Sequence, residues 1–133
     1  MFGNKPPKPD SRIDTLIGAL TRVDGNIQFS GGLRVDGTVK GNISAQDNGT
    51  IVVSEEAVVE GEIRVAHAVI NGKVVGPIHG SESVELQAKS SVTGDVHYKS
   101  LEVHLGAIVQ GRLVHGTDVR ADKIISLKPG TGD

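Results

Sequence analysis

His79 and His97 are the side chains whose type and spacing come closest to a metal-binding pair. They are 18 residues apart and occur in similar contexts, GPIH and GDVH. Zinc sites in proteins combine three or four Cys, His and carboxylate ligands. Two imidazoles without a Cys, a third His or a fixed carboxylate make a poor set. We therefore interpret the two histidines as solvated surface residues and expect no metal.

The segment GDVHYKS, at Gly94–Ser100, partly matches the phosphate-binding pattern G-x-x-x-x-G-K-[ST]. Tyr98 replaces the second glycine of that pattern, and no helix is expected to follow and supply amide groups to a phosphate. The chain also has no cysteine, which excludes disulfides and thiolate chemistry. We expect no catalytic residue and no cofactor.

The composition favours strands and turns over helices. Only 2% of the 133 residues are aromatic, and 18 are glycine. The core must therefore be built from Val, Ile, Leu and Ala, and the glycines permit tight reversals. The formal net charge of −2 argues against nucleic acid as a partner. With no apolar run of about 20 residues and no signal-peptide core, we expect a cytoplasmic protein.

The pattern V-x-G-x-[IVL] occurs six times in regular succession. Its leading residues are Val23, Val39, Val59, Val74, Val92 and Val109. The intervals between these positions are 16, 20, 15, 18 and 17. A near-constant period of about 17 residues indicates an internal repeat, and such a repeat determines the fold class.

One connection of variable length explains the uneven period. In most copies a further aliphatic pair precedes the pattern, as in LRV at 33–35. The link from this pair has three residues in DGT and NGK, where the period is shortest. It has five residues in SEEAV, QAKSS and HLGAI. A solenoid absorbs such changes at a corner while its strands keep their stacking.

The aliphatic residues alternate with period 2, as in strands that bury one face. We interpret each V-x-G-x-I unit as one strand, with its glycine on the opposite face. Short strands at this period predict an all-β, single-domain β-helix of about six coils, with inward ladders of Val and Ile. His79 and His97 then fall in adjacent coils. We expect them to stack on the outer surface and to make assembly sensitive to pH.

The run from Asp14 to Ile43, DTLIGALTRVDGNIQFSGGLRVDGTVKGNI, resembles the opening of a bactofilin domain. The similarity continues through VVVSEEAVVEGEI, VINGKVVGPI, VTGDV and LGAIVQGRL, and it covers about residues 14–115. The resemblance implies a right-handed, three-sided β-helix that polymerises without nucleotide into non-polar filaments, joined head to head and tail to tail. It also implies a bacterial cytoskeletal scaffold at the inner face of the cytoplasmic membrane. Such scaffolds act in cell shape, polarity or envelope synthesis, with cell-wall or polarity proteins as partners.

The expected organisation is a disordered tail at 1–12, a β-helix at 13–120, and a final strand with a short disordered tail at 121–133. KIISL, at 123–127, is the candidate for the final strand. A helical spacing near the start also allows a short capping helix, although Gly18 and the family match favour a strand. The residues with this spacing are Ile13, Leu16, Ile17 and Leu20.

A solenoid without polar or helical caps exposes an apolar cross-section and open strand edges at each end. No convincing cap is evident, so we expect copies to stack through their end coils. The residues predicted for this polymer interface are Leu16, Ile17 and Val23 at one end, and Val109, Leu113 and Val119 at the other. The alternative is a monomeric β-helix binding module capped by its own tails.

Met1 and Phe2 precede Lys5 and Lys8 in the leader MFGNKPPK. An apolar wedge beside cations can bind anionic lipid, and each Lys contributes about 1 kcal/mol near such a surface. Some bactofilins have a similar leader, which implies membrane targeting. The alternative is an ordinary solvated terminus.

The rival class is an enzyme, the hexapeptide-repeat acyltransferases, which are left-handed β-helices with coils of about 18 residues. Aliphatic or Ala residues do recur every six positions from Ile27 to Val75. The pattern then breaks at Ser81 and Gln87, and the coil length varies more than that family allows. We therefore expect a structural protein and no enzyme.

Overall fold

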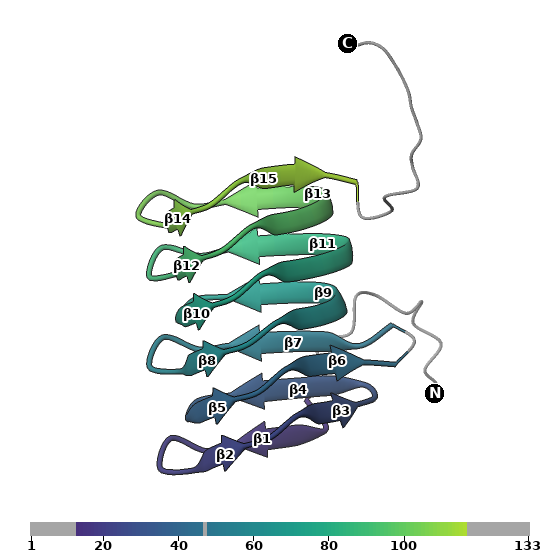
Figure 1. Cartoon of the computed structure of the whole chain (residues 1–133), viewed down its shortest axis with the longest axis vertical. Coiled ribbons are helices and arrows are strands. Elements are labelled where there is room, and N and C mark those ends of the chain that lie inside the picture. Colours follow the sequence, from purple (N-terminus) through teal and green to yellow (C-terminus); the bar gives the residue numbers. More distant parts are fainter. Residues whose placement is uncertain (1–12, 47, 117–133) are drawn as a thin grey trace, which may run out of the picture.

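The computed structural model describes residues 13–46 and 48–116 of the chain. Within these ranges every regular element is a β-strand, and the strands form a column of stacked coils (Figure 1). All of the strand pairs are parallel. The predicted all-β β-helix of about six coils is confirmed.

Each coil crosses three faces. The first face is formed by β1 (Thr15–Ile17), β4 (Gly32–Val35), β7 (Thr50–Val53) and the C-terminal halves of β9 (Ile63–Ile70), β11 (Ile78–Leu86) and β13 (Val96–Val103). The second is formed by β2 (Arg22–Asp24), β5 (Thr38–Lys40), β8 (Val58–Glu60), β10 (Lys73–Val75), β12 (Ser91–Thr93) and β14 (Ile108–Gln110). The third is formed by β3 (Ile27–Phe29), β6 (Ile43–Ala45), the N-terminal halves of β9, β11 and β13, and β15 (Leu113–His115).

The strand register confirms the repeat that the sequence predicts. On the second face the leading valines of the pattern are all aligned partners, so the length of each coil equals the interval between two successive valines. Because each valine stacks on its counterpart in the next coil, one side chain per coil fills the same place in the interior. Coil length varies while this stacking is kept.

The interior consists of ladders of aliphatic side chains. The members in the middle coils are fully buried, as Val39, Val59 and Val74 on the second face illustrate. The corresponding members on the third face are Ile43, Ile63 and Ile78, which are also fully buried. Burying a side chain of this size contributes about 1.5–3 kcal/mol. The ladders therefore supply the stabilisation that large aromatic residues provide in other folds.

The interpretation of V-x-G-x-I as one strand is wrong. The valine lies on the second face and the isoleucine opens the third, so the glycine between them lies at a corner, here called corner II. In the pattern at Val39, strand β5 ends at Lys40 and β6 begins at Ile43. Both aliphatic residues still point inward, because the turn at Gly41 redirects the chain by one face. A straight strand and a two-residue corner both leave inward aliphatic residues at every second or fourth position of the sequence. The pattern alone therefore does not distinguish them, which explains the error.

Corner II requires glycine because the coils touch there through their backbones. An ideal Cβ on Gly41 would come within 2.0 Å of the Gly25 carbonyl oxygen, and one on Gly61 within 2.1 Å of the Gly41 oxygen. Gly41 and Gly61 also have φ angles of +154° and +153°, which other residues rarely adopt. The glycines of the repeat thus meet a requirement of the backbone.

Polar side chains next to these glycines join one coil to the next. Asn26 Oδ1 accepts a hydrogen bond from the Asn42 amide at 2.9 Å, and Asn42 Oδ1 accepts one from the Glu62 amide at 3.0 Å. In a later coil, Asp95 Oδ1 accepts from the Arg112 amide at 2.9 Å. The Arg112 side chain also holds the pKa of Asp95 below its usual value through a hydrogen bond.

The corner between the first and second faces, here called corner I, has two lengths, as the sequence predicts. The short form has Asp36–Gly37 or Asn71–Gly72 between the strands. The long form is a four-residue turn closed by a hydrogen bond from its fourth amide to its first carbonyl, at 3.0–3.1 Å. The long turns are 18–21, 54–57, 87–90 and 104–107. The turn at 18–21 follows strand β1, so the expected strand, and not a capping helix, occupies this end.

Candidate polymerisation interface

The inward ladders end in partly exposed aliphatic residues at the C-terminal end of the described coils. Val103 continues the ladder of Leu86, and Leu113 continues that of Val96. Leu86 and Val96 are completely buried, whereas Val103 is 48% exposed and Leu113 46% exposed. Within the described residues no further coil covers them. The same side chains that form the core elsewhere thus form an apolar end surface here.

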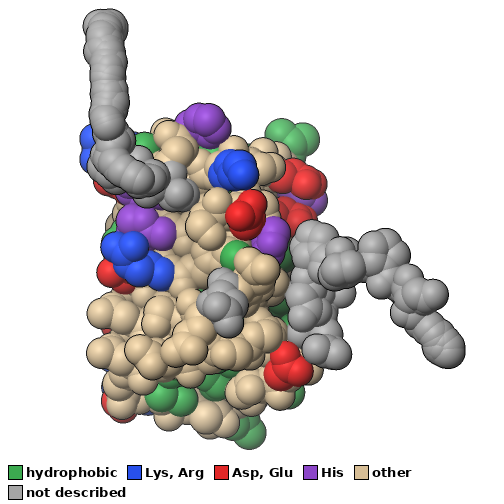
Figure 2. All heavy atoms as spheres, turned by 90° about the vertical axis from the view of Figure 1, so that its right-hand side faces the viewer, with side chains coloured by type: hydrophobic (Ala, Val, Ile, Leu, Met, Phe, Trp, Pro, Cys, Tyr) green, Lys and Arg blue, Asp and Glu red, His purple; other side chains and the backbone are tan. Residues whose placement is uncertain are grey.

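The N-terminal end has a corresponding but better covered set. Ile17 begins the ladder that continues with Val35, and Val23 begins the one that continues with Val39. Ile17 is buried and Val23 is half-buried. Ile27 and Phe29 of β3 are also half-buried and pack against the core. Figure 2 shows hydrophobic side chains at this lower end of the molecule.

The structure brings together most of the residues predicted for the polymer interface. Val109 and Leu113 both lie in inward ladders of the last described coil, and Ile17 and Val23 both lie in those of the first. Leu16 is different, because it is exposed on the outer side of the first face, in line with Arg34.

Other predictions concern residues that the structure does not describe. Val119 and the expected strand KIISL lie beyond residue 116, and the leader residues Met1, Phe2, Lys5 and Lys8 lie before residue 13.

Sequence reasoning missed several members of the end surface. Val103 is exposed in the last coil, and Ile27 and Phe29 are half-buried in the first. The ladder pattern contains the signal that would have found them. Val103 and Ile27 are the last and first members of columns whose interior members are aliphatic and buried, and Phe29 begins the column that continues with Ala45, so the exposure of each follows from its place in the stack.

The backbone of each end coil also has an open side. Strands β14 and β15 each pair with one neighbour, β12 and β13, and within the described residues no strand lies on their other side. At the opposite end β1, β2 and β3 likewise each pair with a single strand in this part of the chain. Open strand edges are templates for pairing with another chain.

His79 and His97 stack on the outer side of the third face, as predicted. They are register partners in β11 and β13, with ring centroids 4.5 Å apart and ring planes inclined by 13°. His79 Nε2 lies 2.9 Å from a Glu62 carboxylate oxygen, which also pairs with Arg64 at 2.9 Å. Figure 2 faces the right-hand edge of Figure 1 and shows histidine, Lys or Arg, and Asp or Glu side chains on the upper half of that edge.

The pKa of His79 lies below its ordinary value of 6.5. Burial is the largest cause, and the positive charges of Arg64 and His97 act in the same direction. Glu62 opposes them through its charge and its hydrogen bond. The imidazole is thus held closer to its neutral form in the folded chain.

One further group places three metal-ligand side chains close together. Ligand atoms of Glu85, Glu102 and His104 lie within 4.8 Å of one another. His104 Nε2 is 2.8 Å from Glu102 Oε2 and 3.3 Å from Glu85 Oε2, and Gln87 donates to Glu85 at 3.0 Å. The three side chains and Gln87 therefore contact one another beside corner I. Proximity alone does not identify a metal centre.

The segment Gly94–Ser100 does not form a phosphate loop. Gly94 is a corner II glycine, and the residues from Val96 onward belong to strand β13. The amides of Gly94 and Val96 donate to the carbonyls of Gln110 and Arg112 in the next coil. These two amides therefore form hydrogen bonds between neighbouring coils of the solenoid. No helix in the described part of the chain has the length and apolar character needed to cross a membrane.

Comparisons with known proteins agree with this architecture. The family model described as "Bactofilin: Polymer-forming cytoskeletal" matches residues 15–114. Bactofilin BacO of Myxococcus xanthus (strain DK1622) is 34% identical over 100 residues, which cover 75% of this chain and 78% of BacO. Bactofilin BacP of the same organism is 30% identical over 120 residues, which cover 90% of this chain and 49% of BacP.

The chain thus spans about half of the length of BacP. The comparison with solved structures found no match. The family is described as polymer-forming and cytoskeletal, and both relatives are bactofilins. The matched region coincides with the described strands, from β1 to β15. On the family match and the three-sided stack of coils together, this chain belongs to the bactofilin family.

Proposed function

We propose that this chain is a bacterial cytoskeletal scaffold whose copies stack end to end into filaments. The observation that carries the proposal is the apolar end surface, where buried ladders finish in half-exposed Val103 and Leu113. The family's description as polymer-forming and cytoskeletal supports the same interpretation. The joints are head to head and tail to tail, so the filament is non-polar, and assembly needs no nucleotide.

End-to-end stacking would cover the exposed aliphatic side chains of the end coils and would pair their open strand edges. Each aliphatic side chain that becomes fully covered contributes up to about 1.5–3 kcal/mol. The open edges of β14 and β15 would gain a strand partner at the same time. Several such side chains per joint provide enough free energy to offset the cost of bringing two copies together.

Replacing Leu113 with arginine tests this surface. In Leu113→Arg a charge lies in the ladder that ends the solenoid, where a joint would have to bury it without a partner. We expect full-length Leu113→Arg to sediment as single copies or short oligomers under conditions in which the natural chain forms filaments.

Gln110→Arg is the matched control for this substitution. Gln110 is exposed on β14 of the same coil, and its neighbour Val109 occupies the inward ladder. The control adds the same charge to the same coil but leaves the end ladders unchanged, so its filaments should persist. If Leu113→Arg forms filaments as readily as Gln110→Arg, the C-terminal end is not a joint.

We also propose that the filament lies at the inner face of the cytoplasmic membrane, held by the leader residues Met1, Phe2, Lys5 and Lys8. Burial of Phe2 and the charges of two lysines give a weak affinity for a single chain. Many leaders on one filament would act together and bind strongly. From this position the scaffold would serve cell shape, polarity or envelope synthesis, with cell-wall or polarity proteins as partners.

Flotation with anionic liposomes tests the membrane proposal, because filaments sediment without lipid but do not float. We expect the full chain to float with the liposomes and a chain lacking residues 1–8 to remain at the bottom of the gradient. The variant Lys5→Gln/Lys8→Gln should float less than the natural chain at low salt, where charge attraction to the lipid is strongest. Equal flotation of the full and shortened chains would exclude the leader as the membrane anchor.

A further inference from the structure

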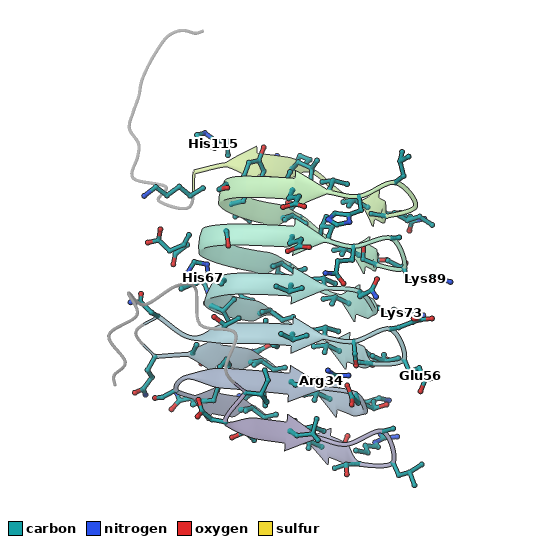
Figure 3. The ribbon with its side chains drawn as sticks, turned by 180° about the vertical axis from the view of Figure 1, so that it is seen from behind. Arg34, Glu56, His67, Lys73, Lys89 and His115 are labelled. Carbon is teal, nitrogen blue, oxygen red and sulfur yellow. The ribbon has the colours of Figure 1, made fainter. Side chains whose placement is uncertain are left out.

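The four long turns of corner I have the same backbone hydrogen bond but different side chains at their tips. Each turn has four residues, and its two middle residues are exposed positions. In the two interior turns the middle residues are Glu55 and Glu56, and Ala88 and Lys89. Figure 3 shows Glu56 and Lys89 projecting from the same edge of the molecule.

The turns of the first and last described coils carry leucine instead. Leu20 occupies the position of Glu56 and Lys89, and it is 102% exposed. Leu105 occupies the position of Glu55 and Ala88, and it is 96% exposed. These are the two most exposed large hydrophobic side chains of the described residues.

The turn itself does not require leucine at these positions. The interior coils form the same turn with charged residues, and the closing hydrogen bond is equally short in all four turns. A fully exposed leucine also gains nothing from the fold of its own copy, because its burial is close to zero. Leucine occurs here only in the two coils that bound the described stack.

Both leucines lie next to the surfaces already assigned to the joints. Leu105 lies two residues after Val103, which ends the ladder of Leu86 and is exposed in the last described coil. Leu20 lies between Ile17 and Val23, which begin two of the inward ladders. A second copy stacked on either end would therefore lie close to the leucine of that end.

We propose that Leu20 and Leu105 are contact residues of the filament joints, which extend the interface from the core ladders to the tip of corner I. The partner at each end is a second copy of this chain. The inference rests on the proposed end-to-end assembly. It adds a contact outside the solenoid interior and predicts that one joint depends on Leu20 and the other on Leu105.

The test uses substitutions that the protein already contains at equivalent positions of other coils. Leu20→Glu copies Glu56, and Leu105→Glu copies Glu55, so both variants should fold, as their circular dichroism melting curves will verify. Leu20→Lys, which copies Lys89, and Leu105→Ala, which copies Ala88, provide a second variant for each end. The matched controls are Lys89→Glu and Ala88→Glu, which place the same glutamate at the equivalent positions of an interior turn.

We expect each leucine variant to raise the critical concentration for assembly at least about tenfold, because the joint loses the burial of one leucine per copy. Below that concentration Leu20→Glu should form discrete pairs joined at their C-terminal ends, and Leu105→Glu pairs joined at their N-terminal ends. The double variant should sediment as single copies, while both controls form filaments at the natural threshold.

Filaments from the leucine variants at the natural threshold would overturn the inference and leave end-to-end assembly intact. A natural chain that forms no filaments at any concentration would overturn the proposed function, and the joint contacts with it. The two failures are therefore distinguished by the natural chain alone, measured by sedimentation velocity and electron microscopy in the same buffer.

Discussion

Gly61 lies at corner II, directly against the backbone of Gly41 in the preceding coil. A Cβ on Gly61 would come within 2.1 Å of the Gly41 carbonyl oxygen, and the φ angle of +153° is unfavourable for any other residue. The obstacle is backbone, which cannot move aside as the end of a flexible side chain can. The spacing between coils therefore depends in part on the absence of a side chain at this position.

We expect Gly61→Ala to lower the free energy of unfolding by at least about 1–3 kcal/mol, the cost of one strained backbone conformation, with the clash added. Urea unfolding followed by circular dichroism measures the change. Gly18→Ala is the control, because a Cβ at Gly18 has no atom within 4 Å and should change stability by less than about 0.5 kcal/mol. Equal unfolding midpoints for the two variants would contradict the contact.

The repeat period predicts which residues face the interior, whereas exposure at the two ends follows only from the place of a residue in the stack. Val39, Val59 and Val74 are recognisable from spacing alone, since a repeated period places them in one column. The exposure of Val103 depends on its being the last member of its column, and no local pattern signals that. Leu16 is aliphatic like its inward neighbour Ile17 yet points outward, because a strand alternates its side chains.

Strands β11 and β13 bring His79 and His97 together on the third face, where Glu62, Arg64 and Asp95 lie around them. The folded chain lowers the pKa of His79 below 6.5, so the unfolded chain takes up this proton at a higher pH than the folded chain. Protonation therefore favours unfolding. The contribution of His79 is fully present above about pH 6.5 and declines as the pH falls below it.

We expect the urea midpoint to fall between pH 7.5 and pH 5.5, and His79→Gln to reduce that fall because the glutamine does not titrate. The measurement is a pair of unfolding curves at the two pH values for each protein. Val114→Gln, at the next position of the same outer column, should keep the natural pH dependence. A pH dependence that His79→Gln leaves unchanged would show that this histidine is not the group responsible.

Of the three corners of each coil, the sequence predicts corner I, whose length varies, but it does not predict the other two. Corner I can be recognised in the sequence because the links DGT and SEEAV differ in length, while the aliphatic residues on either side of them keep their order. Corner II was misread because V-x-G-x-I alternates like a strand. The third corner joins the third face to the first face of the next coil. It cannot be recognised in the sequence because β9, β11 and β13 continue through it, with only a register irregularity between Gly80 and Ser83 in β11.

The described coils form a stack, and at its two ends aliphatic side chains are partly exposed and strand edges lack a partner within the described residues. Six coils at a strand spacing of about 4.8 Å give a copy about 29 Å long. A non-polar filament repeats only after two copies, hence about every 58 Å along its axis. The sequence predicts this shape from the number and period of its repeats. It cannot predict the proposed joint contacts, because Leu20 and Leu105 lie at turn positions whose residue type differs from coil to coil.

The central claim is that the ends of the solenoid join copies of this chain without a nucleotide. Electron microscopy of the purified full chain, in buffer containing a chelator and no nucleotide, tests it most directly. We predict unbranched filaments one solenoid wide, with an axial repeat of about 58 Å from two stacked copies, which Leu113→Arg abolishes. Single copies at every concentration, or filaments that form only after a nucleotide is added, would contradict it.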